Sequence, residues 1–418
     1  MRVLLVSSNT ERLNMPTMPV GLALVAEATR KGGHEVLFLD LMHEADPAEA
    51  LRRAVAAHAP QVIGVSVRNI DDQSMQGPRL LVAQVRPIIE ACRAASRAPI
   101  VLGGTGFSLF PGPLLDYLGA DYGVCGDGEV VFGALLDRLG RSEDPFGLPG
   151  VHAVGRSGPA EASFAAELDP LPLPEPELWS YLDPDTPDLW VPVQSRRGCP
   201  NDCSYCATFR IQGRRLRSRS PGLVAESVGR MVQAGFRRFY FVDNSFNIPE
   251  PHAFELCRRL AGLGAQWRCI LYPERVDEGL VRAMKEAGCV EVALGFESGS
   301  AGVLRAMNKR YTPAQVRATA DLLARFGIRR MGFLLLGMPG ETRETVEESL
   351  AFADSLHLDM LRITVGVRIY PGTPLARIAL EQGAIDPGDD LFLPRFYVAP
   401  GLEPWIHKRV QVGVTAKR

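Results

Sequence analysis

The chain has 418 residues, of which 46% are hydrophobic and 22% are charged, and its 46 basic and 48 acidic residues leave a formal net charge of -2. This length favours two domains with ordinary packed cores. The balanced charge argues against a nucleic-acid partner, and no hydrophobic run reaches the roughly 18 residues of a membrane span. Because the N-terminus also lacks the features of a signal peptide, we expect a cytoplasmic protein.

Hydrophobic runs alternate with helical patterns over residues 1–140. Strands are expected at 3–7, 35–39, 62–67, 100–103 and 122–125, and helices at 21–31 and 47–58. This alternation predicts a parallel sheet covered by helices on both faces, with ligands bound at the carboxyl ends of the strands. The first domain is therefore expected to be Rossmann-like.

The loops that follow these strands are polar and rich in glycine. They contain Asn9, then Arg68 and Asn69, then the segments 103–108 (GGTGFS) and 126–129 (GDGE). Glycines at such positions allow a ligand to approach the backbone. No G-x-G-x-x-G pattern follows the first strand, so a dinucleotide is not favoured. The alternative is a domain that only supports the rest of the enzyme.

Nine prolines fall within residues 141–190. So many prolines exclude long helices and central strands, so this stretch is expected to be an extended connector.

A second alternation covers residues 191–390. Strands are expected at 191–195, 239–242, 268–272, 291–294, 330–336 and 361–367, with helices between them at 223–234, 251–263, 278–287, 313–326 and 345–356. Six strand–helix units are too few for a closed eight-fold barrel, so we expect a partial (β/α)6 TIM-like barrel with its site at the carboxyl ends of the strands. Residues 391–418 form a C-terminal tail.

Three cysteines lie close together after the first strand of this barrel. Cys199, Cys203 and Cys206 have the spacing C-x3-C-x2-C, and no histidine lies near them. In a reducing compartment, clustered thiols indicate metal or redox chemistry. Zinc usually takes four ligands, whereas three cysteines leave one iron of a [4Fe–4S] cluster open to a substrate or cofactor. The alternatives are a structural metal site or three unrelated core thiols.

The spacing, with Tyr205 before the third cysteine, resembles the signature of the radical S-adenosylmethionine (radical SAM) superfamily. The resemblance implies that SAM binds the open iron and contacts loops after the later strands. A cation in the segment 308–312 would pair with the methionine carboxylate of SAM. The residues implied in SAM binding are Tyr205, Asp243, Asn244, Glu297, Ser298, Arg310, Leu336 and Gly337. Asp243-Asn244 departs from the Gly-Gly-Glu of many members, which puts that contact in doubt.

The N-terminal loops resemble the cobalamin-binding domain that precedes many radical SAM domains. The residues implied in cobalamin binding are Asn9, Arg68, Asn69, Gly103, Gly104, Gly106, Phe107, Gly126 and Glu129. The D-x-H-x-x-G motif, whose histidine binds cobalt in other cobalamin proteins, is absent. A residue after the third strand would then face the cobalt, and Arg68 and Asn69 are the candidates.

Together these resemblances imply a cobalamin-dependent radical SAM enzyme. It would methylate an unactivated carbon of a small-molecule or natural-product substrate, using a 5′-deoxyadenosyl radical, methylcobalamin and an external electron donor of the flavodoxin or ferredoxin type. A radical rearrangement, cyclisation or ring contraction is the alternative reaction. An electron-transfer module is disfavoured, because electron carriers usually have four cysteine ligands. A zinc-stabilised binding protein is the third class.

Overall fold

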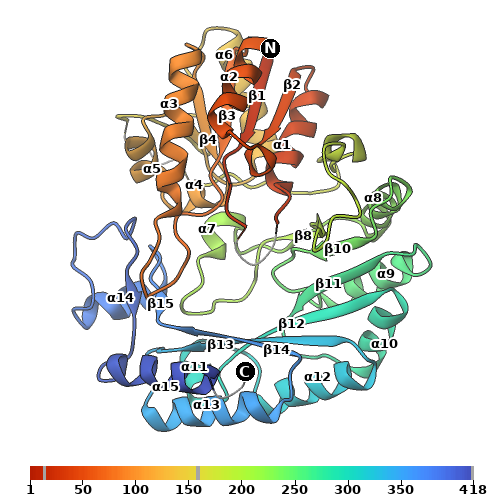
Figure 1. The fold of residues 1–418 in the computed structure, drawn as a ribbon, viewed down its shortest axis with the longest axis vertical. Helices are drawn as coiled ribbons and strands as arrows, with labels where there is room; N and C mark the ends of the chain where they lie inside the picture. Colours follow the sequence, from red (N-terminus) through yellow and green to blue (C-terminus); the bar gives the residue numbers. More distant parts are fainter. Residues whose placement is uncertain (13–15, 157–160, 416–418) are drawn as a thin grey trace.

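The computed structural model describes residues 1–12, 16–156 and 161–415. Its framework consists of two separate parallel sheets, one in the N-terminal third of the chain and one in the C-terminal half (Figure 1). Among the described residues no helix is both long and apolar enough to cross a membrane.

The N-terminal sheet has six strands in the order β2-β1-β3-β4-β5-β6. The strands are β1 (Arg2–Ser7), β2 (Glu35–Asp40), β3 (Val62–Ser66), β4 (Ile100–Gly103), β5 (Tyr122–Val124) and β6 (Val151–Ala153), of which only β6 is antiparallel to its neighbour. The main helices are α1 (Val20–Lys31), α2 (Pro47–His58), α3 (Val85–Ala95), α4 (Thr105–Leu109), α5 (Pro111–Leu118) and α6 (Gly128–Gly140). Residues 3–6 of β1 are all buried, as expected for a strand with helices on both faces. The predicted Rossmann-like arrangement is confirmed.

The second sheet also has six strands, in the order β14-β13-β12-β11-β10-β7, and all of its pairs are parallel. The strands are β7 (Val191–Val193), β10 (Arg238–Phe241), β11 (Gln266–Leu271), β12 (Cys289–Glu297), β13 (Arg329–Leu336) and β14 (Met360–Val365). The helices between them are α8 (Pro221–Gln233), α9 (Glu250–Leu260), α10 (Glu278–Glu286), α11 (Ala301–Ala306), α12 (Pro313–Arg325) and α13 (Arg343–Ser355). Because β7 and β14 stand at opposite ends of this order, the barrel is partial, as predicted.

Local sequence signals explain where the barrel helices begin. Thr312 and Gln315 form a capping box at the start of α12, and Thr342 and Thr345 form one at the start of α13. Such caps satisfy backbone N–H groups that the first turn leaves without partners. The helices therefore start directly after the polar loops at the carboxyl ends of the strands, where a site is expected.

Short elements complete the structure in regions where only loops were expected. The strand β6 lies within the proline-rich stretch and pairs at the edge of the first sheet, where proline-rich neighbours are tolerated. The two-residue strands β8 (Arg196–Arg197) and β9 (Arg217–Ser218) form an antiparallel ribbon on either side of α7 (Thr208–Gln212). In the tail, β16 (Phe396–Tyr397) pairs with β15 (Val367–Arg368), and α14 (Pro374–Glu381) and α15 (Glu403–Thr415) flank it.

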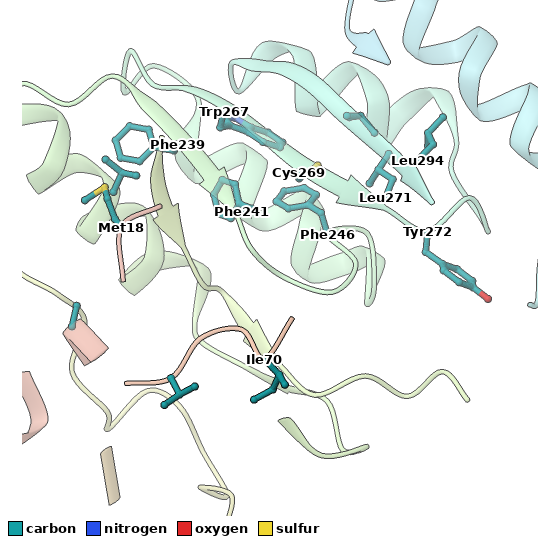
Figure 2. Close-up of a cluster of buried hydrophobic side chains, with 14 of the residues drawn as sticks. Met18, Ile70, Phe239, Phe241, Phe246, Trp267, Cys269, Leu271, Tyr272 and Leu294 are labelled. Atoms are coloured by element: carbon teal, nitrogen blue, oxygen red, sulfur yellow. The ribbon is translucent and has the colours of Figure 1, made fainter. Parts of the chain in front are cut away.

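The hydrophobic core continues from one domain into the other. Figure 2 shows the aromatic rings of Phe241, Phe246 and Trp267, whose centroids lie 4.8–5.3 Å apart, with Ile70 and Met18 from the N-terminal domain in the same buried cluster. The cysteines outside the motif (92, 125, 257, 269 and 289) are all buried. This shared core fixes the N-terminal domain against the barrel.

Candidate active site

The cysteine loop lies between the ribbon strand β8 and the helix α7, directly after the first barrel strand. The three thiols are partly buried. The backbone N–H of Cys199 donates to Gly213 (3.2 Å), and that of Ser204 donates to Met307 (3.0 Å). Gly198 has φ +86° and packs so closely that an added Cβ would lie 2.1 Å from a backbone oxygen of Arg215. These contacts give the loop one defined path.

The donor set of this loop fits a [4Fe–4S] cluster with one open iron. In the described ranges, no three His, Cys, Asp or Glu side chains converge to hold a single metal ion. The cysteines of a cubane cluster each bind a different iron, so they need not converge. Burial raises the pKa of the Cys199 and Cys203 thiols, while the positive charge of Lys309 acts in the opposite direction on Cys203.

A buried lysine stands beside the cysteine loop. The Nζ atom of Lys309 donates to the hydroxyl of Tyr205 (3.0 Å) and lies 3.4 Å from Oε1 of Glu297, and its side chain is 6% exposed. The rings of Tyr205, Tyr272 and Tyr311 surround this ammonium at 5.2–6.0 Å from their centroids. Burial is the largest effect on Lys309 and lowers its pKa, but the charge of Glu297 and smaller contributions from Tyr311, Cys203 and Tyr272 together outweigh it. The pKa is therefore raised, and the lysine stays protonated. The carboxylate, the cation and the tyrosine of the cysteine loop thus form one unit.

The end of β12 has an unusual backbone at this place. Glu297 has φ +59°, a left-handed conformation that a non-glycine residue rarely adopts, and the pairing with β13 is irregular between Gly295 and Glu297. The hydroxyl of Tyr311 holds the carbonyl of Gly295 at 2.7 Å. Such strain is frequent at functional sites, since the surrounding structure must hold it in place. The distortion brings the Glu297 carboxylate to Lys309.

The structure separates the residues that sequence reasoning assigned to SAM. Tyr205 and Glu297 meet at Lys309, whereas Arg310 is half exposed and lies 3.6 Å from the surface residue Asp202. The buried cation of the segment 308–312 is therefore Lys309, whereas the predicted residue Arg310 is half exposed; a contact of either with SAM stays a prediction. Asn308, with φ +58°, turns the chain at this point.

Two further predicted residues form hydrogen bonds inside the protein. Both carboxylate oxygens of Asp243 accept hydrogen bonds from Ser195 and Arg196, at 2.5–3.4 Å, so Asp243 ties the ends of β7 and β10 together. Ser298 is buried and lies 2.9 Å from the hydroxyl of Ser349. These bonds give Asp243 and Ser298 structural roles, and a contact of either with SAM stays a prediction.

The remaining predicted residues on the SAM side lie at strand ends. Asn244 donates to the carbonyl of Gly198 (3.2 Å) and so contacts the start of the cysteine loop. Leu336 is buried and ends β13, and Gly337 follows it with φ +104°. The backbone N–H of Gly337 donates to the buried carboxylate of Glu341 at 2.5 Å. Asn244 is therefore close to the cysteine loop, whereas Leu336 and Gly337 lie at the end of β13, and the contacts of all three with SAM stay predictions.

A cavity of about 360 Å³ lies between the two domains. Its N-terminal walls come from the loops after β1, β3, β4 and β5, and its opposite wall comes from the first barrel strands and from α7. The barrel residues in this wall are Trp190, Pro192, Gln194, Arg197, Ile211, Gln212, Tyr240 and Val242. None of these eight was expected from the sequence, because they join the cavity only when the domains dock.

Most of the residues predicted to bind cobalamin line this cavity. Asn9, Arg68, Gly103, Gly104, Gly126 and Glu129 do so. Asn69, Gly106 and Phe107 are not among the lining residues. Phe107 is fully buried beneath Gly123, and a Cβ at Gly106 would lie 3.1 Å from a backbone oxygen of Val67, so these two residues support the wall from behind.

The wall of the cavity is open at two of its glycines, Gly21 and Gly103. A Cβ added at Gly103 would meet only the backbone oxygen of Val124 at 4.0 Å, and one added at Gly21 would meet no atom within 4 Å. Arg68 lies in the cavity and donates to the hydroxyl of Thr17 (3.3 Å). Arg68 is exposed to the cavity, and partial desolvation by the surrounding protein lowers its pKa; in the described part of the chain no carboxylate pairs with it. The donor groups and the open wall fit a cobalamin.

Comparison with known proteins agrees with this geometry. Residues 9–136 match the family model of the B12 binding domain, and residues 193–353 match that of the radical SAM superfamily. The chain therefore contains a B12-binding domain followed by a radical SAM domain. The family confirms the expected cofactors: a [4Fe–4S] cluster and SAM for the barrel, and cobalamin for the N-terminal domain.

Curated relatives are similar over almost the whole chain. An uncharacterized methyltransferase, PH0819, of Pyrococcus horikoshii is 27% identical, over 92% of this chain and 84% of the relative. The tryptophan 2-C-methyltransferase of Streptomyces laurentii is 26% identical, over 90% of this chain and 74% of the relative. The solved structure of the radical SAM methyltransferase TsrM from Kitasatospora setae, with tryptophan substrate and a SAM analog bound, superposes with a TM-score of 0.85 at 26% identity, over 98% of this chain and 88% of that one.

Proposed function

We propose that this protein is a cobalamin-dependent methyltransferase that transfers a methyl group from SAM to an unactivated carbon of a small-molecule substrate. The observation that carries this proposal is the shared cavity. Four loops of the B12-binding domain face β7 and β10, the barrel strands next to the cysteine loop. The cavity of the B12-binding domain therefore lies beside the barrel strand that leads into the cysteine loop. The names of the similar methyltransferases support the same reaction class.

When bound, the cluster supplies the electron that cleaves SAM, and cobalamin supplies the methyl group. The chain's own residues bind and orient these groups. Cys199, Cys203 and Cys206 are the proposed cluster ligands. The protonated Lys309 would pair with the methionine carboxylate of SAM, and Glu297 would accept a hydrogen bond from its ribose. Arg68, which lies in the cavity, is a better candidate than Asn69 to face the cobalt.

The proposed setting follows from the same chemistry. All eight cysteines are unpaired, as expected in a reducing compartment such as the cytoplasm. An external donor of the flavodoxin or ferredoxin type would reduce the cluster. A cavity of about 360 Å³ suits a small-molecule substrate rather than a nucleic acid.

The test does not require the substrate. The reconstituted protein is loaded with hydroxocobalamin, reduced without oxygen and incubated with SAM that carries a deuterated methyl group, and S-adenosylhomocysteine is measured by mass spectrometry. Methyl transfer predicts about one S-adenosylhomocysteine per bound cobalamin and none without cobalamin, because reduced cobalamin takes the methyl group from SAM. Formation of 5′-deoxyadenosine with no S-adenosylhomocysteine would contradict the proposal and favour a rearrangement, cyclisation or ring contraction.

A further inference from the structure

Four buried charges connect the B12-binding domain to the β8–β9 ribbon, whose strands lie on either side of the cysteine loop in the chain. Arg197 pairs with Asp127 (3.0 Å) and with Glu129, and Arg217 pairs with Asp127. All four side chains are at most 6% exposed. The two arginines belong to the barrel domain. Asp127 is the N-cap of α6, and Glu129 lies in the first turn of that helix. We call Asp127, Glu129, Arg197 and Arg217 the charge clamp.

The positive charges of the two arginines in the ribbon are balanced by carboxylates of the other domain. In the antiparallel pairing of β8 and β9, Arg197 stands directly opposite Arg217. Like charges at opposed positions of a strand pair destabilise it, and buried charges without partners are costly. The two carboxylates that balance these arginines both come from the B12-binding domain. The ribbon is therefore stable in this form only when the domains are docked.

The clamp residues are adjacent to both proposed cofactor sites. Arg197 is followed by Gly198 and Cys199, so it sets where the cysteine loop begins. On the other side, Asp127 and Glu129 lie in the segment 126–129 that lines the cavity. A displacement of the clamp would move the cysteine loop and the cavity wall together.

The connector between the domains is also held by the clamp. The backbone N–H of Ala165 donates to Asp127 (2.9 Å), and Arg217 donates to the carbonyl of Ala165 (2.9 Å). Arg217 stacks over the ring of Phe164, 5.3 Å from its centroid, and donates to the carbonyl of Gln212 (2.6 Å) at the end of α7. A single arginine thus joins the connector, α7 and the B12-binding domain.

We propose that the charge clamp positions the cysteine loop relative to the cobalamin cavity and couples the occupation of the two sites. Binding of cobalamin would steady the segment 126–129, and through Arg197 and Arg217 it would steady the cysteine loop; by reciprocity, a filled cluster site would favour cobalamin binding. This inference needs both sites to hold their cofactors, and it does not depend on whether the reaction is a methyl transfer.

The first test uses the unaltered full chain. The reconstituted protein is exposed to an iron chelator without oxygen, with and without bound hydroxocobalamin, and iron release is followed by absorbance. The coupling predicts that cobalamin slows iron release at least about 5-fold, the lower end of ordinary coupling between sites. Equal rates would overturn the proposal, and no turnover enters the measurement.

The second test changes Arg217, which lies outside both the cysteine motif and the lining of the cavity. Arg217→Met is expected to weaken cobalamin binding about 10-fold, to alter the electron paramagnetic resonance spectrum of the reduced cluster, and to abolish the slowing by cobalamin. Arg217→Lys keeps the charge and should restore part of the coupling. The matched control is Arg156→Met, which breaks the half-exposed pair of Arg156 with Asp144 in the same region of the chain and should change nothing. An Arg217→Met protein that folds and keeps the wild-type coupling would refute the role of the clamp.

Discussion

The cysteine loop and the cobalamin cavity are two sites of one enzyme that are built in opposite ways. The loop places its three thiols within the segment 199–206, and a few backbone hydrogen bonds give it its path. The cavity takes its walls from four loops of one domain and from two strands and a helix of the other. A site made from contiguous residues is visible in the sequence. For a site formed where two domains dock, the sequence reveals only the glycine-rich loops of one wall.

The two sites also differ in how they balance charge. At the cysteine loop a buried lysine is paired with Glu297 before any cofactor is present. In the cavity, Arg68 pairs with no carboxylate of the described residues, and it is left to interact with whatever occupies the cavity. The charges beside the cysteine loop are therefore paired before a cofactor binds, whereas the charge of Arg68 in the cavity is available to a ligand. The predictions below test this difference.

The largest effect is expected from the loop itself. Cys203→Ala should abolish cluster binding and turnover, because the remaining two thiols cannot hold a site-differentiated cubane. Cobalamin affinity should fall by no more than about 10-fold, the size of an ordinary coupling between sites. Iron content and cobalamin titration measure both. Cys257→Ala, at a buried core cysteine, is the control that should keep the cluster. Loss of all cobalamin binding in Cys203→Ala would show that the two sites are not separable.

The buried lysine is expected to give the next largest effect. Lys309→Met removes the charge that faces Glu297 and Tyr205 and leaves a buried carboxylate without its partner, so the kcat/KM for SAM cleavage should fall on the order of 100-fold. Arg310→Met, at the adjacent half-exposed residue, should change it less than about 3-fold. The formation of 5′-deoxyadenosine measures both. Equal losses in the two variants would mean that the pocket around Lys309 does not matter for SAM.

A change at Gly103 in the cavity wall should weaken cobalamin binding and leave the cluster in place, the opposite of the result expected for Cys203→Ala. Gly103→Leu fills open space in the cavity without a backbone clash and should weaken cobalamin binding about 10-fold or more, while the cluster is retained. The control is Gly133→Leu in α6, where an added Cβ also meets no atom within 4 Å and the residue does not line the cavity. Cobalamin titration and iron content are measured for both variants. Unchanged cobalamin affinity in Gly103→Leu would move the cobalamin site away from this wall.

Sequence reasoning succeeded where a signal is local and failed where it depends on docking. The two parallel sheets follow from long alternating patterns, and the cysteine motif follows from its spacing. The ribbon β8–β9 was missed because strands of two residues have no periodicity. The strand β6 was missed because the prolines around it exclude central strands but allow an edge strand.

The sequence pattern could not show which of two neighbouring cations is buried, because burial depends on tertiary contacts. Lys309 and Arg310 are adjacent, and the left-handed turn at Asn308 together with the three surrounding tyrosines decides which one is buried. The partners of Arg197 and the lining residue Tyr240 could be recognised only after the two domains were placed together. The sequence therefore shows the cysteine loop more fully than it shows the walls of the cavity.

The smallest effect concerns a carboxyl group at the barrel mouth that has no cation. Asp127 and Glu129, beside the cavity, pair with arginines, whereas Glu341 accepts hydrogen bonds from the backbone of Gly337 and Met338 through one oxygen only. Its other oxygen, Oε1, finds no partner among the described residues. Burial raises the pKa of Glu341 to about 7, and the two backbone hydrogen bonds only partly oppose this.

A carboxyl group whose pKa is higher in the folded state than in the unfolded chain stabilises the fold at low pH. For Glu341 this contribution is complete below pH 4.5, the ordinary value of the group, and is lost as the pH rises through about 7. Glu341→Gln keeps an acceptor for both N–H groups and has no charge to bury. The unfolding free energy of the variant relative to the wild type should therefore rise by about 3 kcal/mol between pH 4.5 and 8.

Thermal unfolding of the reconstituted protein across this pH range measures the change, and Glu347→Gln, at a carboxylate paired with Arg409 on the surface of α13, should show no comparable trend. A pH-independent difference between Glu341→Gln and the wild type would mean that Glu341 stays ionised, which requires a cation or a water to reach Oε1. In that case the charge of Glu341 would be balanced by a bound partner, as we expect for Arg68 in the cavity. The barrel site and the cavity would then differ less in how their charges are balanced.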